Sequence, residues 1–421
     1  MAGSLTLTSR VSVGHIVGVS SPIGNSIVRW RNRGKPPPLP TPSPRPLTTD
    51  HLHTRSYTFM NPLEAELDYP LGDLLPELGN VHELAPGVLW LRMGLPFALN
   101  HINLWLLEDT IDTGTGPRSG WTAIDCGVSN PATQAAWDTI FAEHLRGLPI
   151  VRVLCNHCHP DHVGLADWLC RRWQAPLWMT AGEYGFARMM SAALPGVDGT
   201  AMLPHFQRHG LTDPALVAQL GERKSYYPTL VPGVPQSYVR LQDRQDVAIG
   251  GRTWRIITGF GHAPEHAALY CDALQMLISG DMVLPRISTN VSVFAIEPES
   301  NPVQAYLDSL QKFTDLPATT LVLPSHGKPF RGLHIRIRQL TEHHAARLTE
   351  VVDACATPQS AATIVPIMFA RALDAHQLTF ALGEALAHLH KLWYDGVLSR
   401  RAGADGVIRF QTVAAAAASV H

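Results

Sequence analysis

One short stretch, residues 156–162, constrains this chain more than any other part of its sequence. It reads Asn-His-Cys-His-Pro-Asp-His and places three histidines and one aspartate within six positions, directly after the apolar run 150–154. Imidazole and carboxylate groups are the usual ligands of zinc and similar divalent ions. On extended backbone, side-chain direction alternates with a period of two, so the rings of His157 and His159 point to the same side. The stretch therefore predicts a metal site at the end of a buried strand.

The same stretch indicates two metal ions rather than one. Residues 163–173 predict a helix, which places Asp161 and His162 at the turn into it, close to the first histidine pair but aimed elsewhere. Two ligand sets side by side favour two metals. The alternative is a polar loop with solvated histidines, and four ligand-type residues in six positions argue against it.

Length and composition set only wide limits on fold and partners. A chain of 421 residues predicts two or three folding units, or one large domain with additions. The 33 basic and 35 acidic residues nearly cancel, so the overall charge indicates neither a nucleic-acid nor a membrane partner. No apolar run is long enough to span a bilayer. The six cysteines show no paired framework, which predicts buried free thiols and a reducing, cytoplasmic compartment.

Residues 1–59 differ in composition from the rest. They carry seven basic residues against a single acid, Asp50, and the segment 35–46 is dense in proline and should be extended. Three interpretations compete: a disordered basic tail, an organellar transit peptide, or an upstream extension with translation beginning at Met60. We favour the last two over a folded role, and the start-site interpretation first. The segment does not have the pattern of a secretory signal.

The central part of the chain predicts an α/β layered domain. Strands are expected at 88–93, 103–108 and 121–127, then a helix at 131–145 and the strand 150–154. This order places a site at the carboxyl edge of a strand.

Residues 181–240 break this rhythm. Helices are expected at 187–194 and 213–223, and the segment is too long for a plain connection. We predict a cap insertion that covers the metal site and shapes the substrate pocket; the alternative is a surface excursion.

Further ligand-type residues follow later strands, which are expected at 247–249, 254–257, 269–271, 276–278 and 320–324. His262 ends the run Gly-Phe-Gly-His, Asp281 follows Ser-Gly, and His326 follows Pro-Ser. From residue 334 the pattern changes to three helices, 336–355, 361–369 and 381–393, followed by a hairpin of 397–401 and 406–410. This order predicts a winged-helix-like domain over 334–411.

Taken together, these motifs resemble the metallo-β-lactamase superfamily. The match comprises the 157–162 motif, His262, Asp281, His326 and the Asp125 of Ala-Ile-Asp-Cys-Gly, in the family's order across residues 81–333. The resemblance implies an α/β fold, an αββα sandwich with a dinuclear site in the groove at one edge. It implies that one ion is bound by His157, His159 and His262, the second by Asp161, His162 and His326, and that Asp281 bridges both. The expected cofactors are two divalent ions, zinc ahead of iron or manganese, since the same ligands accept all three.

Three nearby residues are not expected to bind metal. In the family, the aspartate matching Asp125 supports the loop beside the metals. We expect His266 to pack beside or support the ligands, because His262 already matches the ligand position. Cys158 points away from its neighbours and is expected to pack.

The resemblance implies a hydrolase that uses a metal-bridged hydroxide as nucleophile, with Asp161 or a metal-bound water as the proton shuttle to the leaving group. We predict a small-molecule acyl substrate, a thioester, ester or lactone, as in glyoxalase II-like enzymes and lactonases. An antibiotic-degrading lactamase is disfavoured, because those enzymes need an export signal and most lack the aspartate represented by Asp281.

Two other functions remain as alternatives. The first is an endoribonuclease or other nuclease, since members of the family with a similar winged-helix tail include an endoribonuclease. Acidic residues offset the basic ones in the tail, whereas a nucleic-acid face needs a basic stripe. The tail is therefore expected to form a homodimer or to wall the active-site groove. The second is a non-catalytic binding protein, which the complete ligand set argues against.

Overall fold

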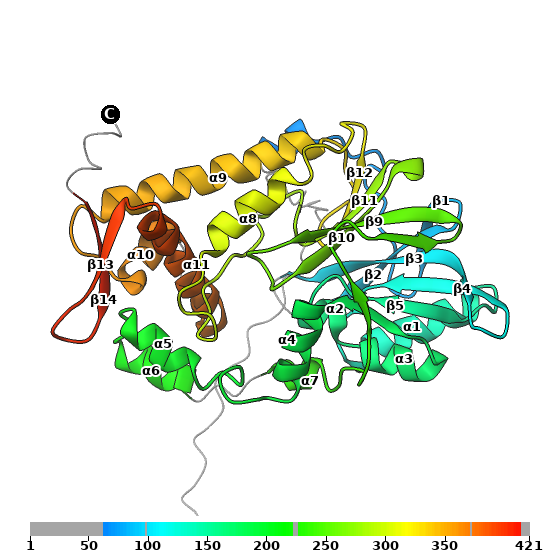
Figure 1. The fold of residues 1–421 in the computed structure, drawn as a ribbon, viewed down its shortest axis with the longest axis horizontal. Helices are drawn as coiled ribbons and strands as arrows, with labels where there is room; N and C mark the ends of the chain where they lie inside the picture. The colour runs from blue at the N-terminus through cyan, green and yellow to red at the C-terminus, as the bar shows by residue number, and fades with distance from the viewer. Residues whose placement is uncertain (1–61, 97–98, 222–225, 371–372, 414–421) are drawn as a thin grey trace, which may run out of the picture. The chain divides into compact units, whose positions relative to one another are not determined.

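The computed structural model describes residues 62–96, 99–221, 226–370 and 373–413. The extension 1–59 and its three interpretations lie outside these residues. Within them, two β-sheets face each other, and helices cover both outer faces (Figure 1). The predicted αββα sandwich is therefore confirmed.

The first sheet has seven strands in chain order. Its first four strands are antiparallel and the later ones are added in parallel. The strands are β1 (Val81–Ala85), β2 (Val88–Gly94), β3 (His101–Asp112), β4 (Pro117–Ile124), β5 (Ile150–Leu154), β6 (Leu177–Thr180) and β7 (Val239–Leu241).

The second sheet has five strands in the order β12-β11-β10-β9-β8. Strands β11 and β12 are parallel and the other pairs are antiparallel, so β9, β11 and β12 all end at the same edge. The strands are β8 (Asp246–Ile249), β9 (Arg252–Gly259), β10 (His266–Cys271), β11 (Met276–Gly280) and β12 (Leu321–Pro324).

Helices fill the outer layers, the insertion and the C-terminal region. Those before the second sheet are η1 (Pro62–Glu66), α1 (Pro131–Glu143), α2 (Pro160–Val163), α3 (Ala166–Trp173), α4 (Ala181–Ser191), α5 (Met202–Arg208), α6 (Pro214–Gly221) and α7 (Tyr227–Leu230). The helices that come after the start of the second sheet are η2 (Asp272–Leu274), α8 (Pro302–Gln311), α9 (Leu333–Ala354), α10 (Ala361–Met368) and α11 (Ala375–Tyr394). The hairpin of β13 (Leu398–Ala402) and β14 (Ile408–Thr412) follows them.

Strand β2 shows how residue alternation builds the layers. Val88 and Trp90 lie in the core between the two sheets, where Trp90 stacks on Trp105. Leu89 and Leu91 lie on the opposite face, in the core beneath α1 and α3. This is the period-two pattern of a strand that is covered on both sides. Strand β5 is buried throughout, and its predicted bounds are confirmed.

Some predicted bounds were wrong. The single helix predicted over 163–173 is divided into α2 and α3. The break lies at Leu165, which has φ of −100° and ψ of 11° and donates its N–H to the Gly127 carbonyl at 3.1 Å. Gly164 beside it must be glycine, because the backbone oxygens of Gly127 and Leu230 leave no room for a Cβ. The helix predicted at 187–194 begins earlier, at Ala181. Helix α8 was not predicted, although Asn301 caps it and Pro302 occupies its first position.

The insertion and the C-terminal region are closely associated. Phe206, Leu211 and Leu220 of the insertion share one hydrophobic core with Leu382 and Phe410 of the C-terminal region. The predicted order of three helices and a hairpin is present there, while the winged-helix assignment stays a prediction. No described helix is both long enough and apolar enough to cross a membrane.

Candidate metal centre

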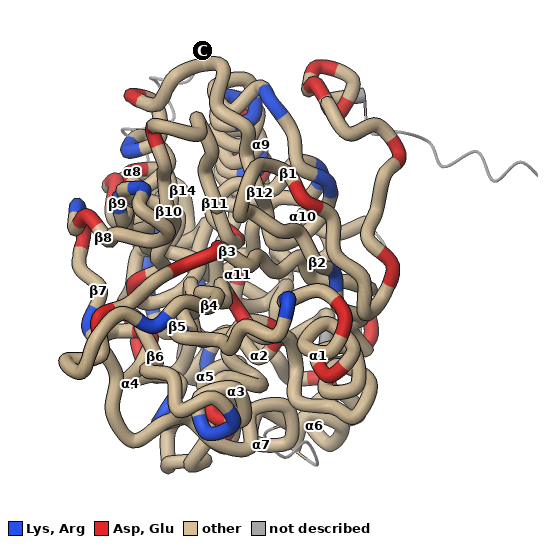
Figure 2. The backbone as a smooth tube through the Cα atoms, turned by 90° about the vertical axis from the view of Figure 1, so that its right-hand side faces the viewer, with Lys and Arg blue, Asp and Glu red and all other residues tan. Residues whose placement is uncertain are grey.

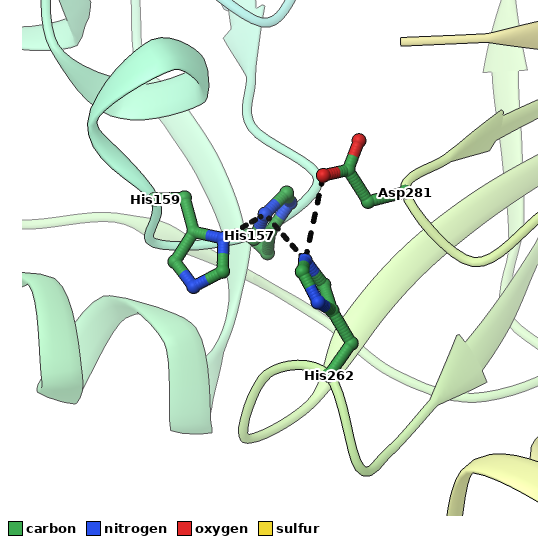
Figure 3. Close-up of side chains that lie close together, drawn as sticks. All are labelled: His157, His159, His262 and Asp281. Carbon is green, nitrogen blue, oxygen red and sulfur yellow. Dashed lines mark hydrogen bonds and ion pairs between the residues drawn. The ribbon is translucent and has the colours of Figure 1, made fainter. Parts of the chain in front are cut away.

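The first group of ligand-type side chains contains three histidines and one aspartate. His157 and His159 follow β5, and their ring centroids lie 4.5 Å apart, as the predicted pairing on one side requires. His157 Nε2 lies 2.9 Å from His159 Nδ1 and 3.3 Å from His262 Nε2 (Figure 3). His262 Nε2 lies 3.4 Å from Asp281 Oδ2. All four donor atoms lie within 4.8 Å of one another.

The second group contains Asp161, His162 and His326. Asp161 Oδ2 lies 3.7 Å from His162 Nε2 and 3.4 Å from His326 Nε2. Asp161 and His162 lie on the short helix α2, and His326 follows β12. Ligand-type residues from the ends of several strands therefore meet at one edge of the sandwich.

Asp281 lies between the two groups and faces both. Its Oδ2 faces His262, whereas its Oδ1 lies 3.6 Å from His162 Nε2 and 3.4 Å from His326 Nε2. One carboxylate therefore presents one oxygen to each group. The structure brings together all seven residues predicted as ligands, in the predicted two sets.

The donor atoms fit two divalent cations. A tetrahedral ion with bonds of about 2.0–2.1 Å needs donors roughly 3.4 Å apart, close to the separations above. His162 Nε2 and Asp281 Oδ1 are buried and have no hydrogen-bond partner. Buried polar atoms without a partner are costly, and a shared cation would satisfy both.

Hydrogen bonds on the far side of the rings fix the orientation of three histidines. The Nδ1 of His162 lies 2.8 Å from Asp125 Oδ2, that of His262 lies 2.8 Å from the Asn290 carbonyl, and that of His326 lies 2.8 Å from the His101 carbonyl. Each acceptor is an oxygen, so each Nδ1 donates and each Nε2 lone pair faces the other donors. Asp125 thus occupies the supporting position that was expected of it.

Tight backbone turns place the later ligands. Gly261 has φ of +93°, and a Cβ there would clash with the Pro302 carbonyl oxygen. Gly280 has φ of +54°, and a Cβ there would clash with the His266 ring. Only glycine adopts these conformations without strain and fits the space. His266 Nε2 in turn accepts a hydrogen bond from the Asp281 N–H, so it supports Asp281 and is in neither donor group.

The electrostatic field of the second group attracts cations. Burial lowers the pKa of His162, but the carboxylates of Asp125, Asp161 and Asp281 outweigh it and raise the pKa to about 9. In the first group, burial and then the charge of His262 lower the pKa of His159 to about 3. The carboxylates therefore concentrate negative potential on the side of Asp161 and His162.

Comparison with known proteins supports the same assignment. The family model described as metallo-beta-lactamase superfamily matches residues 116–326, which include every ligand-type residue of both groups. The chain belongs to the metallo-β-lactamase superfamily. A second model, described as the metallo-beta-lactamase-like C-terminal domain, matches residues 348–413. Members of the superfamily typically bind divalent metals, in agreement with the donor groups of this member.

Similar proteins include two solved structures and a curated relative. A beta-lactamase domain protein from Burkholderia ambifaria is 58% identical, with 84% of this chain and 100% of that chain covered and a TM-score of 0.79. A metallo-beta-lactamase family protein from Thermus thermophilus is 27% identical, with 79% and 100% covered and a TM-score of 0.64. A probable metallo-hydrolase from Bacillus subtilis is 22% identical over 333 residues, covering 72% of this chain and 92% of the relative.

In this superfamily member, the insertion holds the ligand loops directly. Glu183 of α4 is fully buried, and its Oε2 accepts the Cys158 N–H at 2.8 Å while its Oε1 accepts the Glu265 N–H at 2.6 Å. Cys158 lies between two ligand histidines, and Glu265 follows His262. The Tyr227 hydroxyl donates to the Cys158 carbonyl, so both backbone groups of Cys158 are held. Sequence reasoning missed Glu183, because an acid in the first turn of a helix usually faces solvent.

A second link joins the metal centre to the C-terminal helices. Asn290, whose carbonyl accepts from His262, also donates its side-chain Nδ2 to Glu384 of α11 at 3.1 Å. Burial raises the pKa of Glu384 to about 7, although the Asn290 hydrogen bond and the charge of Arg347 oppose the rise. No local pattern in the sequence indicates this pair, since the two residues lie in different regions of the chain.

The cysteines are as predicted. All six are free and buried. Burial, followed by the charge of Glu183, raises the pKa of the Cys158 thiol, which lies in neither donor group. These thiols are packing groups.

Proposed function

We propose that the protein is a dinuclear-metal-dependent hydrolase of acyl compounds, with thioesters ahead of esters and lactones. The arrangement of Asp281 carries the proposal, because its two oxygens face different donor groups. We assign His157, His159 and His262 to one divalent ion, Asp161, His162 and His326 to the other, and Asp281 to both. Zinc is the expected metal, ahead of iron and manganese.

When bound, divalent ions lower the pKa of water toward neutrality and polarise a substrate carbonyl. The protein's residues supply the rest. Asp125 holds His162 in the tautomer that presents Nε2, and Glu183 holds the two ligand loops against each other. One carboxylate oxygen of Asp161 lies within the second donor group. We assign this carboxylate the transfer of a proton to the leaving group.

A thioester substrate has support from a relative. A protein from Passalora fulva named atrochrysone carboxyl ACP thioesterase is 22% identical over 351 residues, covering 80% of this chain and 81% of that protein. The two therefore correspond over most of their length. The free, buried cysteines support the expected reducing, cytoplasmic compartment.

The charges of the C-terminal region argue against nucleic acid as substrate. Its basic side chains are largely paired with acids: Arg338 with Glu342, Arg347 with Glu350, Lys391 with Asp395, Arg400 with Glu299 and Arg409 with Asp405. On the side of the sandwich that faces the viewer in Figure 2, basic and acidic positions are likewise interspersed along the backbone. We therefore assign this winged-helix-like region a role in walling the metal centre, to which Glu384 already connects it.

The deciding experiment combines metal analysis with a substrate panel. We expect close to two divalent ions per chain and hydrolysis of thioesters, with esters and lactones slower and single-stranded RNA untouched. Asp281→Ala should lose metal and turnover together, whereas Asp308→Ala, an exposed acid of α8, should lose neither.

Two results would contradict the proposal. A fully loaded protein with one ion per chain would remove the dinuclear assignment. Cleavage of RNA without acyl hydrolysis would replace the acyl substrate with nucleic acid.

A further inference from the structure

Arg92 lies on the inner face of the first sheet, at the edge that carries the metal centre. Alternate residues of β2 point to the same face, so Arg92 shares the face of Val88 and Trp90, which point toward the second sheet. Its cross-strand partner is Asn103, and residues paired in this way project to the same face. The Asn103 Nδ2 donates to the carbonyls of Pro324 and Gly327 at 2.8 and 2.9 Å, on either side of His326.

A second observation places Arg92 close to the residues around His326. His101 lies two residues before Asn103, on the same face, and its Nε2 accepts the Gly327 N–H at 2.9 Å. Burial lowers the pKa of His101 to about 3, and the charge of Arg92 is the next cause, followed by that of His326. Arg92 and His326 are thus both close enough to His101 to act on its charge.

Within the part of the chain that the structure describes, Arg92 has no partner for its charge. Among the lysines and arginines of the described residues that are at least partly buried, Arg92 alone has neither a side-chain hydrogen bond nor an ion pair. Partial burial lowers its pKa, because desolvation disfavours the charged guanidinium. A charged group that is partly withdrawn from water usually gains a hydrogen bond or an ion pair in compensation. Comparable arginines in this chain are satisfied: Arg118 donates to the Trp173 carbonyl, and Arg152 pairs with Asp109.

We propose that Arg92 binds an anionic group of the substrate, a carboxylate or phosphate located away from the scissile carbonyl. This inference rests on the proposed acyl-hydrolase function and narrows its substrate to acyl compounds with a second, anionic end. A guanidinium presents a planar fork of donors that matches both oxyanions. Substrate placed with its carbonyl at the metal centre and its anion on Arg92 is held at two points, which fixes its orientation.

The test measures binding to the metal-loaded full-length protein, so that it does not depend on turnover. Isothermal titration calorimetry would compare linear dicarboxylates of increasing length with monocarboxylates of the same length. Both kinds offer one carboxylate to the metals, but only the dicarboxylate offers a second to Arg92. Monophosphates of the matching hydroxy acids separate carboxylate from phosphate recognition. We expect the doubly anionic ligand of the right length to bind about 10- to 100-fold more tightly.

Variants make the assignment specific. Arg92→Met keeps the apolar stem and should lose the preference for the doubly anionic ligand entirely, while Arg92→Lys should keep part of that preference. Arg118→Met is the matched control on the same sheet and should keep it in full. The melting temperature of Arg92→Met should equal or exceed that of the wild type, because the variant removes a charge that has no partner among the described residues.

Two outcomes would overturn the assignment: no preference for the doubly anionic ligand at any length, or a preference that survives in Arg92→Met. A fall in melting temperature together with an unchanged preference would give Arg92 a packing role and also overturn it. If the preference depends on Arg92 but no acyl compound is hydrolysed, the anion site stands and the acyl-hydrolase proposal alone fails.

Discussion

Replacing Glu384 by glutamine should make the protein more stable at high pH but not at low pH. Glu384 lies on α11, where its carboxylate accepts a hydrogen bond from Asn290. Burial raises its pKa from 4.5 to about 7, against the opposing effects of Asn290 and Arg347. Glutamine keeps the shape and an acceptor for Asn290 but cannot ionise.

The sign and size follow from the raised pKa. An acid with a higher pKa in the folded state gives its full stabilisation below pH 4.5 and loses it as the pH rises to about 7. The difference between the two pKa values corresponds to about 3 kcal/mol, and the partial exposure of the side chain reduces this to roughly 2 kcal/mol. The glutamine variant does not suffer this loss.

Urea unfolding of the metal-free protein, followed by tryptophan fluorescence between pH 5 and pH 8, measures the difference. The free energy of unfolding of Glu384→Gln minus that of the wild type should rise by roughly 2 kcal/mol across this range. Glu342→Gln, an exposed acid of α9, is the control and should show a constant difference. A flat or falling difference for Glu384→Gln would refute the idea that folding favours its neutral form.

Three further changes test the supports of the ligands. Asp125→Asn removes the charged acceptor of His162 Nδ1 and should weaken metal binding about 10- to 100-fold, measured by competition with a chelator; unchanged affinity would contradict the supporting role. Glu183→Ala leaves two buried N–H groups unpaired and should lower the free energy of unfolding of the metal-free protein by about 2–5 kcal/mol, whereas a loss below that range would mean that water replaces the carboxylate. Gly280→Ala places a methyl group against His266 and should reduce the metal content per chain, and full occupancy would show that the turn can relax.

The sequence was sufficient to predict the layers and the ligand sets for one reason. Three of the strands that precede ligands, β5, β11 and β12, are buried throughout, and such strands are visible as apolar runs. The carboxyl ends of parallel strands meet at one edge, so residues far apart in sequence converge there. The pattern of apolar runs and the family motifs are therefore enough to group His157, Asp281 and His326.

What escaped prediction depends on tertiary contacts that leave no local pattern. Glu183 and Glu384 are acids on helices, where exposure is the ordinary expectation, and only packing shows that they are buried or linked to ligand loops. The helix expected over 163–173 is interrupted at Leu165, whose N–H donates to the carbonyl of Gly127, far earlier in the chain. Arg92 is one charge within an apolar strand, and only the lack of a partner among the described residues distinguishes it. Helix α8, in contrast, carried a visible Asn-Pro start signal.

The hydrogen bonds from Glu183 and Tyr227 to Cys158 have a consequence for attempts to redesign substrate range. The insertion is the obvious segment to exchange between relatives, yet it contains the groups that hold the backbone between two ligand histidines. A chimaera that grafts a foreign insertion would lose metal before it gained a new substrate, unless it carried an acid and a phenol at the equivalent positions. Successful recombination should therefore cut inside the segment, between α4 and α7, and leave both ends native.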